Sequence, residues 1–321
     1  MGLGFIGQEL AKAAIASSEL EIVSALDLDS ARVGRSLPDV LGVPAPDLKV
    51  TSDLTAAFHR AAGGLLLHAT GSRLEKVATE IEAAIGAGMA VVSTCEELSY
   101  PWLRNQKLAE KLDRLAQKKK VAVLGGGVNP GFVLDRLIAT LGAATGRVDK
   151  IRGVRVVDAR TRRLALQRKI GAGLSPDNFD EKVDNHEVGH VGLMESAAMA
   201  ALGVGLEVDE VDEEIEPFLA TADVEGAGGI RVAKGGIAGI FQVARAFKAG
   251  REVCRLELTI ALGAPDPRDE IELHGDPPLR CVFPGGVPGD RATVWSLIHA
   301  APLVRGAQPG LMTVLDLPAG R

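Results

Sequence analysis

The stretch that most restricts the fold of this chain is GLGFIG at residues 2–7, a G-x-G-x-x-G run that opens an apolar helical pattern, GQELAKAAIA. A strand-like run, LEIVSALD, follows and ends at Asp27, 20 positions after Gly7. Glycines at this spacing permit a tight turn and close approach to a pyrophosphate at a helix N-terminus, and an acid at this offset binds ribose hydroxyls. The pattern predicts a dinucleotide site. The alternative interpretation is an ordinary strand-helix turn followed by a coincidental acid.

The same fold needs a β-strand before the glycine run, and only Met1 precedes that run. Strands are usually about five residues long. Without this strand, its two neighbours would carry backbone groups that lack hydrogen-bond partners. We therefore expect either a true start upstream of Met1 or a chain that has lost its central strand.

Short apolar runs alternate with helical patterns up to about residue 125, which predicts a parallel sheet covered by helices. Strands are expected in LEIVSALD, GGLLLHATGS, MAVVSTC and VAVLGGG, and helices in SRLEKVATEIEAAIGAG and NQKLAEKLDRLAQKKK. Ligands of such sheets bind beyond the carboxyl ends of the strands. We therefore expect one crevice to be surrounded by Asp27, Thr70, the segment from Thr94 to Glu96, and the segment from Gly125 to Asn129.

From about residue 148 the pattern changes to an alternation of apolar and polar residues, as in DKIRGVRVVDARTRR, which is typical of antiparallel strands. GGIAGIFQVARAF and REVCRLELTIALGA are expected to form a strand pair, and GDRATVWSLIHAAPLVRGA a helix. The predicted fold class is α/β, a Rossmann-type doubly wound parallel sheet with a second α+β domain that contains a mainly antiparallel sheet. We expect a dinucleotide-binding domain over 1–148, a substrate domain over 149–285, and a C-terminal segment, 286–321, that packs back on the first domain.

Charge, hydropathy and cysteine content narrow the class of protein. A net charge of −6 disfavours nucleic acid as the main partner, and no unbroken apolar run reaches membrane-spanning length. Cys95, Cys254 and Cys281 lie far apart and lack C-x-x-C spacing. That usage argues against a disulfide framework or a zinc site and suits a reducing, cytoplasmic location.

The segment STCEELSYP places two adjacent carboxylates, Glu96 and Glu97, just beyond a predicted strand end. A carboxylate beside a nicotinamide serves as a general acid or base. Because adjacent side chains point in different directions, only one is expected to face the substrate, and Glu96 is nearer the strand end. The alternative is a pair of acids in the first turn of a helix, where the helix dipole favours them. Cys95 is expected to be a buried thiol beside the cofactor rather than a nucleophile, since no activating pair accompanies it.

His186-Glu187-Val188-Gly189-His190 matches the H-E-x-x-H pattern of zinc proteases. Gly189 lies inside the helix that the pattern would need, and no third ligand follows at a suitable spacing. We therefore expect no metal site, and we expect His190 to face the substrate cavity.

Five segments, GLGFIGQELA, STCEELSYP, GGGVNPGFVLD, VVDARTRR and GHVGLMES, together resemble the 2,4-diaminopentanoate dehydrogenase and native amine dehydrogenase family, within the wider group related to dihydrodipicolinate reductase. They run from residue 2 to about residue 196. The resemblance implies NAD(P)-dependent oxidative deamination of a small amine, or reductive amination of a ketone or aldehyde with ammonia. The chain departs from the family in its absent first strand, and it lacks the K-x-D-x-P-S-G-T signature of dihydrodipicolinate reductase itself.

The resemblance also implies roles for individual residues and a homodimer formed through the second domain. The catalytic glutamate falls on Glu96, and the substrate pocket falls on Phe132, Val133, Thr161 and His190. Cofactor contacts are expected from Gly2, Gly4, Phe5, Ile6, Gly7, Asp27, Arg32, Thr70, Thr94, Cys95 and Asn129.

Two questions stay open at this point. Asp27 favours the free ribose hydroxyls of NAD, whereas Arg32 and Arg35 follow closely and suit the 2′-phosphate of NADP, so both cofactors are expected to be usable. Competing functions are a 2,4-diaminopentanoate (diamino acid) dehydrogenase, for which an arginine among residues 160–163 would hold the carboxylate, and a catalytically silent nucleotide-binding protein. Neither a nucleic acid nor a membrane is an expected partner.

Overall fold

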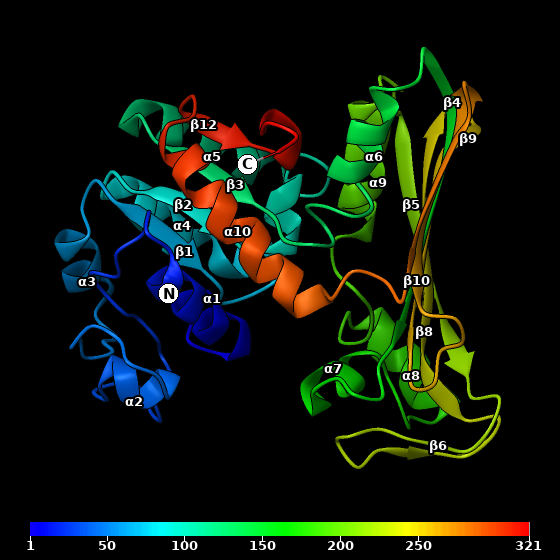
Figure 1. The fold of residues 1–321 in the computed structure, drawn as a ribbon, viewed down its shortest axis with the longest axis horizontal. Coiled ribbons are helices and arrows are strands. Elements are labelled where there is room, and N and C mark those ends of the chain that lie inside the picture. The colour runs from blue at the N-terminus through cyan, green and yellow to red at the C-terminus, as the bar shows by residue number, and fades with distance from the viewer. Residues whose placement is uncertain (321) are drawn as a thin grey trace. The chain divides into compact units, whose positions relative to one another are not determined.

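The computed structural model describes residues 1–320. The chain forms two compact units, one made of Met1–Phe132 with the residues from Pro288 onward, and the other of Val133–Val287. They are called unit 1 and unit 2 below, and Figure 1 labels their elements. None of the helices within residues 1–320 is both long and apolar enough to cross a membrane.

Unit 1 contains a parallel sheet in the order β1-β2-β3-β12. Its strands are β1 (Leu65–His68), β2 (Ala90–Ser93), β3 (Ala122–Gly125) and β12 (Gly310–Met312). Helices α1 (Phe5–Ala16) and α10 (Gly289–Arg305) pack side by side, and so do α4 (Leu74–Gly86) and α5 (Gln106–Lys119). The alternating apolar runs and helical patterns thus gave the Rossmann-type architecture correctly.

One predicted strand of unit 1 is wrong. LEIVSALD does not form a strand, and only Leu26 makes an isolated parallel bridge, to Thr51. Residues 20–24 make no backbone hydrogen bond with any residue in the described part of the chain, 1–320. A β-strand forms only where its backbone hydrogen-bonds to a neighbouring strand, and an apolar sequence does not ensure that such a neighbour is present. Val23, in the middle of this run, remains 41% exposed.

Unit 2 contains a six-stranded sheet in the order β11-β10-β4-β9-β8-β5, in which only the β4–β9 pair is parallel. Its strands are β4 (Arg147–Asp158), β5 (Glu210–Leu219), β8 (Ile237–Lys248), β9 (Arg251–Ala261), β10 (Arg268–Asp276) and β11 (Leu279–Pro284). Helices α6 (Arg136–Gly142) and α9 (Leu193–Gly203) pack on the sheet. A mainly antiparallel sheet in this half of the chain is therefore confirmed.

The remaining elements are short. They are α2 (Leu37–Leu41), α3 (Leu54–Arg60), η1 (Glu96–Ser99), α7 (Leu164–Lys169), α8 (Pro176–Asp184), β6 (Val224–Glu225), β7 (Arg231–Val232) and η2 (Val314–Asp316).

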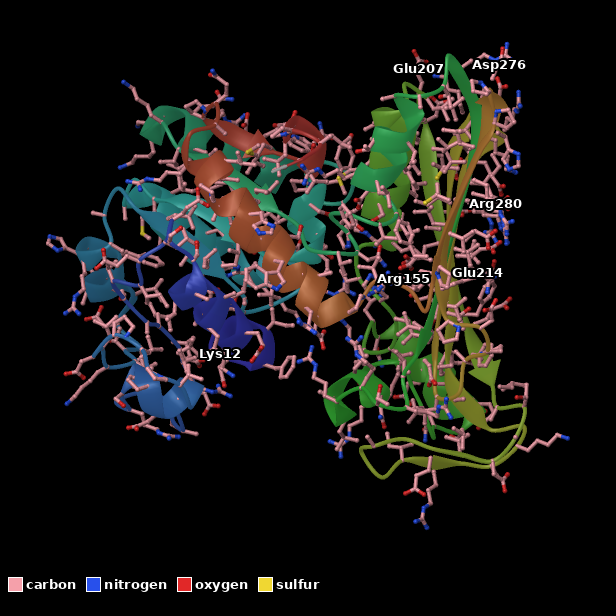
Figure 2. All side chains as sticks on the ribbon, in the orientation of Figure 1. Lys12, Arg155, Glu207, Glu214, Asp276 and Arg280 are labelled. Carbon is pink, nitrogen blue, oxygen red and sulfur yellow. The ribbon has the colours of Figure 1, made fainter. Side chains whose placement is uncertain are left out.

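A buried ion pair fixes the end of unit 2 to its sheet. The Arg155 guanidinium donates to both carboxylate oxygens of Asp269, at 2.7 and 2.8 Å, and to the Val287 carbonyl at 2.8 Å. The Val287 amide donates back to Asp269. Figure 2 labels Arg155 on the sheet. Because neither charge is exposed, removing one partner would leave the other buried and unpaired, which is the costly case for an ion pair.

Candidate nucleotide-binding and catalytic site

The three glycines of the first loop have different structural roles. Gly2 has φ +78°, and a Cβ there would lie 2.6 Å from the Ala69 carbonyl oxygen. A Cβ on Gly7 would lie only 1.6 Å from the Gly2 carbonyl oxygen, so helix α1 can pack on the turn only with glycine at this position. Gly4, the N-cap of α1, has no atom within 4 Å of its would-be Cβ. The turn and the helix are thus held tightly, while the surface in front of Gly4 is open.

Asp27 is tied to this loop. It is 8% exposed, and its carboxylate accepts hydrogen bonds from the Leu3 amide at 2.5 Å and the Asp29 amide at 2.8 Å. Burial works to raise the pKa of Asp27, but the Asp29 and Leu3 amides and the Arg32 charge together hold it below its usual value. Asp27 therefore stays ionised at neutral pH, as a carboxylate that binds ribose hydroxyls must.

The two nearby arginines are positioned differently. Nη1 of Arg32 lies 3.4 Å from Asp27 and 2.8 Å from Asp29. Arg35 donates to the backbone carbonyl of Asp39. Arg32 is therefore held beside the Asp27 carboxylate, which the sequence predicts to bind the ribose, whereas Arg35 is directed to α2.

The carboxyl ends of β1, β2 and β3 meet at one edge of the sheet. His68 pairs with Ser93, and Ser93 pairs with Gly125. Thr70, Thr94 and the Gly125–Asn129 segment follow these paired ends in the chain. Parallel strands deliver their following loops to the same side. These predicted site residues are thus brought to one edge of unit 1 by the register of the sheet.

A buried histidine links two of these strand ends, and sequence reasoning missed its role. Nδ1 of His68 lies 2.7 Å from Oγ of Ser93, and its Nε2 lies 2.9 Å from Oε2 of Glu80. The hydroxyl of Thr70 donates to the same Glu80 oxygen at 2.6 Å. Burial lowers the pKa of His68, so its imidazole is neutral at pH 7. The network orients Thr70, and no local sequence pattern marks the 12-residue spacing between His68 and Glu80.

Glu96 and Glu97 have different surroundings. Glu97 is buried, and its carboxylate accepts from the Arg73 guanidinium at 3.0 Å, the Leu74 amide at 2.8 Å and the Asn105 side chain at 3.3 Å. It thereby caps the first residue of α4. Glu96 begins the 3₁₀ helix η1 and is only partly buried.

The absence of a side chain at Gly125 allows η1 to pack directly against the end of β3. A Cβ on Gly125 would lie 2.4 Å from the Leu98 backbone carbon and 2.6 Å from the Ser99 nitrogen. The end of β3 therefore touches the backbone of the short helix that carries Glu96. Gly125, which was expected at the edge of the ligand crevice, is thus also a packing contact.

Cys95 and Asn129 flank this region. Cys95 is fully buried, its thiol donates to the Ser72 carbonyl at 3.2 Å, and burial strongly raises its pKa, which keeps it a protonated thiol.

Asn129 precedes Pro130 through a cis peptide bond, and Gly131 has φ +126°. A Cβ on Gly131 would lie 2.3 Å from the Gly127 nitrogen, so this loop closes on itself.

The residues assigned to the substrate pocket by family resemblance belong to both units. Phe132 ends the first segment of unit 1 and is partly buried. In unit 2, Val133 is completely buried, Thr161 is exposed and His190 is partly exposed. Gln242 fixes the His190 backbone, accepting from its amide at 2.9 Å and donating to its carbonyl at 2.8 Å.

The H-E-x-x-H segment runs through a loop between α8 and α9 and not through a helix. Gly189 has φ +125°, His186 has φ +58°, and Glu187 is paired with Lys182. The zinc-protease motif places its two histidines on one face of a helix, one turn apart. This segment is not helical, so its histidines are not arranged in that way.

A family model identifies the family of the chain, and solved structures share its fold. Residues 132–321 match the family model for the 2,4-diaminopentanoate dehydrogenase C-terminal domain. The whole chain aligns with 2,4-diaminopentanoate dehydrogenase of Acetoanaerobium sticklandii at 28% identity over 335 residues, covering 93% of that protein. Among solved structures, an amine dehydrogenase from Mycobacterium smegmatis superposes with a TM-score of 0.86 at 24% identity, covering 99% of this chain and 94% of the other. A dihydrodipicolinate reductase from a Paenisporosarcina species gives 0.53 at 11% identity, with 98% and 96% covered.

The residues present fit a dinucleotide. The open space before Gly4 allows the backbone to approach a pyrophosphate, the tight Gly2–Gly7 contact holds the α1 N-terminus in place, and Asp27 is ionised at the position of the ribose.

Gly7→Ala and Gly4→Ala form a matched pair that tests the division of roles in this loop. Gly7→Ala forces the Gly2 backbone to move and should lower the free energy of unfolding by at least about 3 kcal/mol. Gly4→Ala should change it by less than about 0.5 kcal/mol while weakening NAD(P)H binding. Urea unfolding and fluorescence titration measure the two effects. Equal stability of the two variants would contradict the packing role of Gly7.

Proposed function

Because the chain belongs to the 2,4-diaminopentanoate dehydrogenase family, defined by the C-terminal domain model matched over residues 132–321, we propose that it is an NAD(P)-dependent amine dehydrogenase. It deaminates a small amine oxidatively and, in reverse, aminates a ketone or aldehyde with ammonia. The observation that carries this proposal is the contrast between two neighbouring carboxylates beyond β2. The Glu97 carboxylate accepts three hydrogen bonds from Arg73, Leu74 and Asn105. Glu96, by contrast, is partly exposed at the edge where ligands of such sheets bind.

The proposed chemistry needs one proton-transfer group. An alkyl ammonium has a pKa of about 10, like lysine, and must lose a proton before its carbon can release hydride. A nicotinamide bound at this site would supply the hydride chemistry, as acceptor in deamination and as donor in amination. Glu96 takes the proton from the ammonium, and in the reverse direction its protonated form gives a proton to the hydroxyl group that leaves as water. The backbone contact between Gly125 and η1 keeps this carboxylate at a fixed position relative to the strand ends.

Either cofactor is compatible with the arrangement of Asp27 and Arg32. The Asp27 carboxylate binds the ribose hydroxyls of NAD, and the adjacent Arg32 guanidinium pairs with the 2′-phosphate of NADP. The three cysteines are all free thiols, which favours a reducing compartment, and we propose a cytoplasmic location on that basis.

The substrate is proposed to be a small amine without a carboxylate. The competing substrate is a diamino acid, which the name of the Acetoanaerobium relative favours. That substrate would call for a basic side chain to hold its carboxylate. Arg160, one of the arginines that the sequence offered for this purpose, is already paired with Asp158, with Nη2 and Oδ2 2.6 Å apart. The pairing weakens Arg160 as a carboxylate ligand and favours a substrate without a carboxylate.

A cofactor-oxidation assay tests this function. Purified protein is mixed with ammonia, NADH or NADPH, and a panel of small ketones and aldehydes, and the reverse reaction is run with simple amines and with 2,4-diaminopentanoate. We expect turnover with uncharged ketones and amines, and with both cofactors. Turnover with the diamino acid alone would replace the first substrate class by the second. No turnover with any substrate, alongside measurable cofactor binding, would favour a silent nucleotide-binding protein.

Glu96→Gln and Glu97→Gln separate the catalytic role from the structural one. Glu96→Gln should lower kcat by about 10² to 10⁴ fold, because it removes the proton carrier, while the Kd for NADH and the urea midpoint stay unchanged. Glu97→Gln should instead lower the free energy of unfolding by about 1–3 kcal/mol, since it leaves buried donors with a weaker acceptor. Wild-type kcat in the first variant would remove Glu96 from the mechanism.

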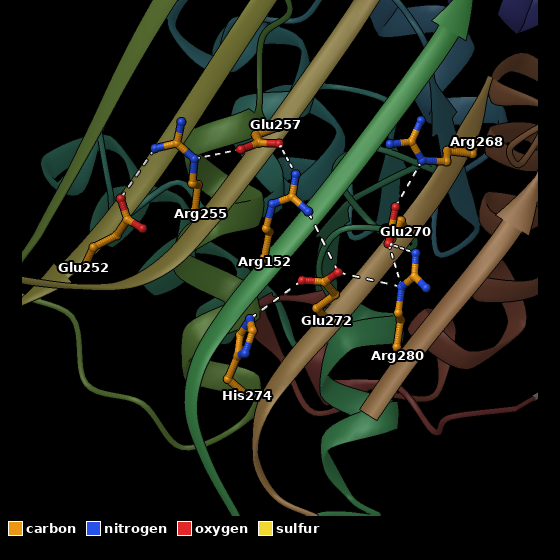
Figure 3. A network of polar contacts seen from close by, with 9 residues as sticks. All are labelled: Arg152, Glu252, Arg255, Glu257, Arg268, Glu270, Glu272, His274 and Arg280. Carbon is orange, nitrogen blue, oxygen red and sulfur yellow. Dashed lines mark hydrogen bonds and ion pairs between the residues drawn. The ribbon is translucent and has the colours of Figure 1, made fainter. Parts of the chain in front are cut away.

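We further propose that the protein is a homodimer formed through the charged face of the unit 2 sheet. Figure 3 shows the network on this face, in which Arg152, Arg255, Arg268 and Arg280 alternate with Glu252, Glu257, Glu270 and Glu272. Four arginines balance four glutamates, so this set carries no net charge, although the chain as a whole has a net charge of −6. Two identical acidic chains repel least where such a neutral surface meets its copy, and charges already paired cost less to bury.

Arg280→Glu tests the dimer. Arg280 is 64% exposed on β11 and lies 2.5 Å from Glu270, so its reversal places like charges together without disturbing the core. The wild-type chain of 33.5 kDa should sediment as a dimer of about twice that mass, and the variant as a monomer. Arg231→Glu, at an 80% exposed position outside the network, is the control and should remain dimeric. A monomeric wild-type protein at micromolar concentration would refute the proposal.

A further inference from the structure

The loop that follows β3 presents a single residue to its surroundings. In the segment 122–131, all of which the structure describes, every residue is buried except Asn129, which is partly exposed. The side-chain amide of Asn129 carries both N–H donors and a carbonyl acceptor. Because the neighbouring residues are buried, the position of Asn129 is determined by how this loop packs against the rest of unit 1.

The base of the loop is anchored to the sheet. The Gly126 amide donates to the Ser93 carbonyl at 2.9 Å, which ties the loop to the end of β2. A Cβ on Gly126 would lie 3.3 Å from Cγ1 of Val314, so the loop also touches η2. These contacts hold the residues that leave β3, and they end two positions before Val128.

A hydroxyl from a distant part of the chain holds the next part of the loop. Thr293 lies near the start of α10, which packs on β2 and β3 within unit 1 and is orange in Figure 1. Its Oγ1 accepts a hydrogen bond from the Val128 amide at 3.2 Å, across 165 residues of sequence. Val128 is only 6% exposed, so the hydroxyl supplies an acceptor to a donor in a buried residue.

Gly127 allows the helix to approach the loop. A Cβ on Gly127 would lie 3.3 Å from Oγ1 of Thr293 and 3.4 Å from its Cγ2. The same Cβ would lie 3.3 Å from the Pro130 carbonyl oxygen, on the returning part of the loop. Thr293 therefore contacts two consecutive residues, Gly127 by packing and Val128 by a hydrogen bond, and Asn129 follows directly.

The loop lies at the end of the site where the reactive ring of a cofactor would be. Asp27 is held by the Leu3 amide, and the glycine loop packs on Ala69, just after β1. The order of the sheet places the end of β3 two strands away from β1. A dinucleotide with its adenosine ribose at Asp27 would therefore extend its nicotinamide toward β2 and β3, the strands that Glu96 and Asn129 follow.

We propose that Thr293 is a positioning residue for hydride transfer. By holding Val128 through its hydroxyl, Thr293 fixes Asn129 beside the nicotinamide carboxamide and thereby sets the orientation of the ring. The proposal rests on the proposed function, in which Asn129 belongs to the cofactor site. Orientation matters because hydride transfer needs its reacting atoms about 3–3.5 Å apart and aligned.

Three variants and a control test the role of the hydroxyl. Thr293→Val keeps the shape of the side chain and removes the acceptor, whereas Thr293→Ser keeps the acceptor. Gly127→Ala keeps the hydroxyl but pushes the loop away from α10. The control is Ser296→Ala, which removes a hydroxyl from the same helix. The measurements are kcat with a ketone and ammonia, the Kd for NADH, and the fluorescence lifetime of bound NADH, which reports on the nicotinamide ring without turnover.

Thr293→Val and Gly127→Ala should each lower kcat by about 10- to 100-fold, because the ring is no longer held in the reactive orientation. The Kd for NADH should change by less than about threefold, since the adenosine end and the pyrophosphate still bind as before. The lifetime of bound NADH should shift toward that of free NADH. Thr293→Ser and Ser296→Ala should resemble the wild-type protein in all three measurements.

Equal loss of kcat in Thr293→Val and Thr293→Ser would overturn the proposal, because it would assign the effect to the shape of the side chain. A wild-type kcat and lifetime in Thr293→Val would overturn it as well. If Thr293→Val does not fold, the comparison of Gly127→Ala with Thr293→Ser decides the question. If the wild-type protein binds NADH but turns over no substrate, the proposed function fails, and the lifetimes alone still show whether the hydroxyl positions the ring.

Discussion

The nucleotide site depends on the contact between the Gly2 carbonyl and helix α1 at Gly7. The oxygen occupies the place of a side chain, 1.6 Å from where a Cβ on Gly7 would be, so the turn and the helix cannot separate or slide without breaking their packing. From this contact the Leu3 amide is directed at Asp27, and the Gly2 amide at Leu26. A carboxylate 20 residues away is therefore fixed relative to the helix N-terminus by the amides of Leu3 and Gly2, in addition to the hydrogen bond that it accepts from the Asp29 amide in its own loop.

In the proposed function, the two adjacent glutamates have different roles, Glu97 in the structure and Glu96 in the chemistry. The Glu97 carboxylate accepts hydrogen bonds from an arginine, a helix amide and an asparagine, so its oxygens are bound within the structure. The same bonds hold η1 against α4 and leave the preceding residue at the strand edge. The fixed position of Glu96 is thus a consequence of what Glu97 binds. An acid that must act in both directions of a reaction needs this kind of fixed position and also contact with water or substrate.

The sequence predicted the elements whose signals are local. The helices α4 and α5 were predicted from the spacing of their own apolar residues. The strands β1, β2 and β3 were predicted from short apolar runs in the same way. LEIVSALD failed because a strand also needs neighbours, and those lie elsewhere in the chain. The His68–Glu80–Ser93 network was missed for the same reason: its members come from β1, α4 and β2 and meet only after the sheet forms. The structural role of Glu97 could not be separated from that of Glu96 without the position of Arg73.

Residues 20–24 and Asp27, the carboxylate proposed to bind the cofactor, belong to one continuous stretch. Leu26 accepts the Gly2 amide and bridges Thr51, and Asp27 follows it directly. Residues 20–24, which form no backbone hydrogen bond within the described residues 1–320, precede these anchors. The position of Asp27 therefore depends on the contacts of Leu26 and of the Asp27 carboxylate itself, and not on the run that precedes them.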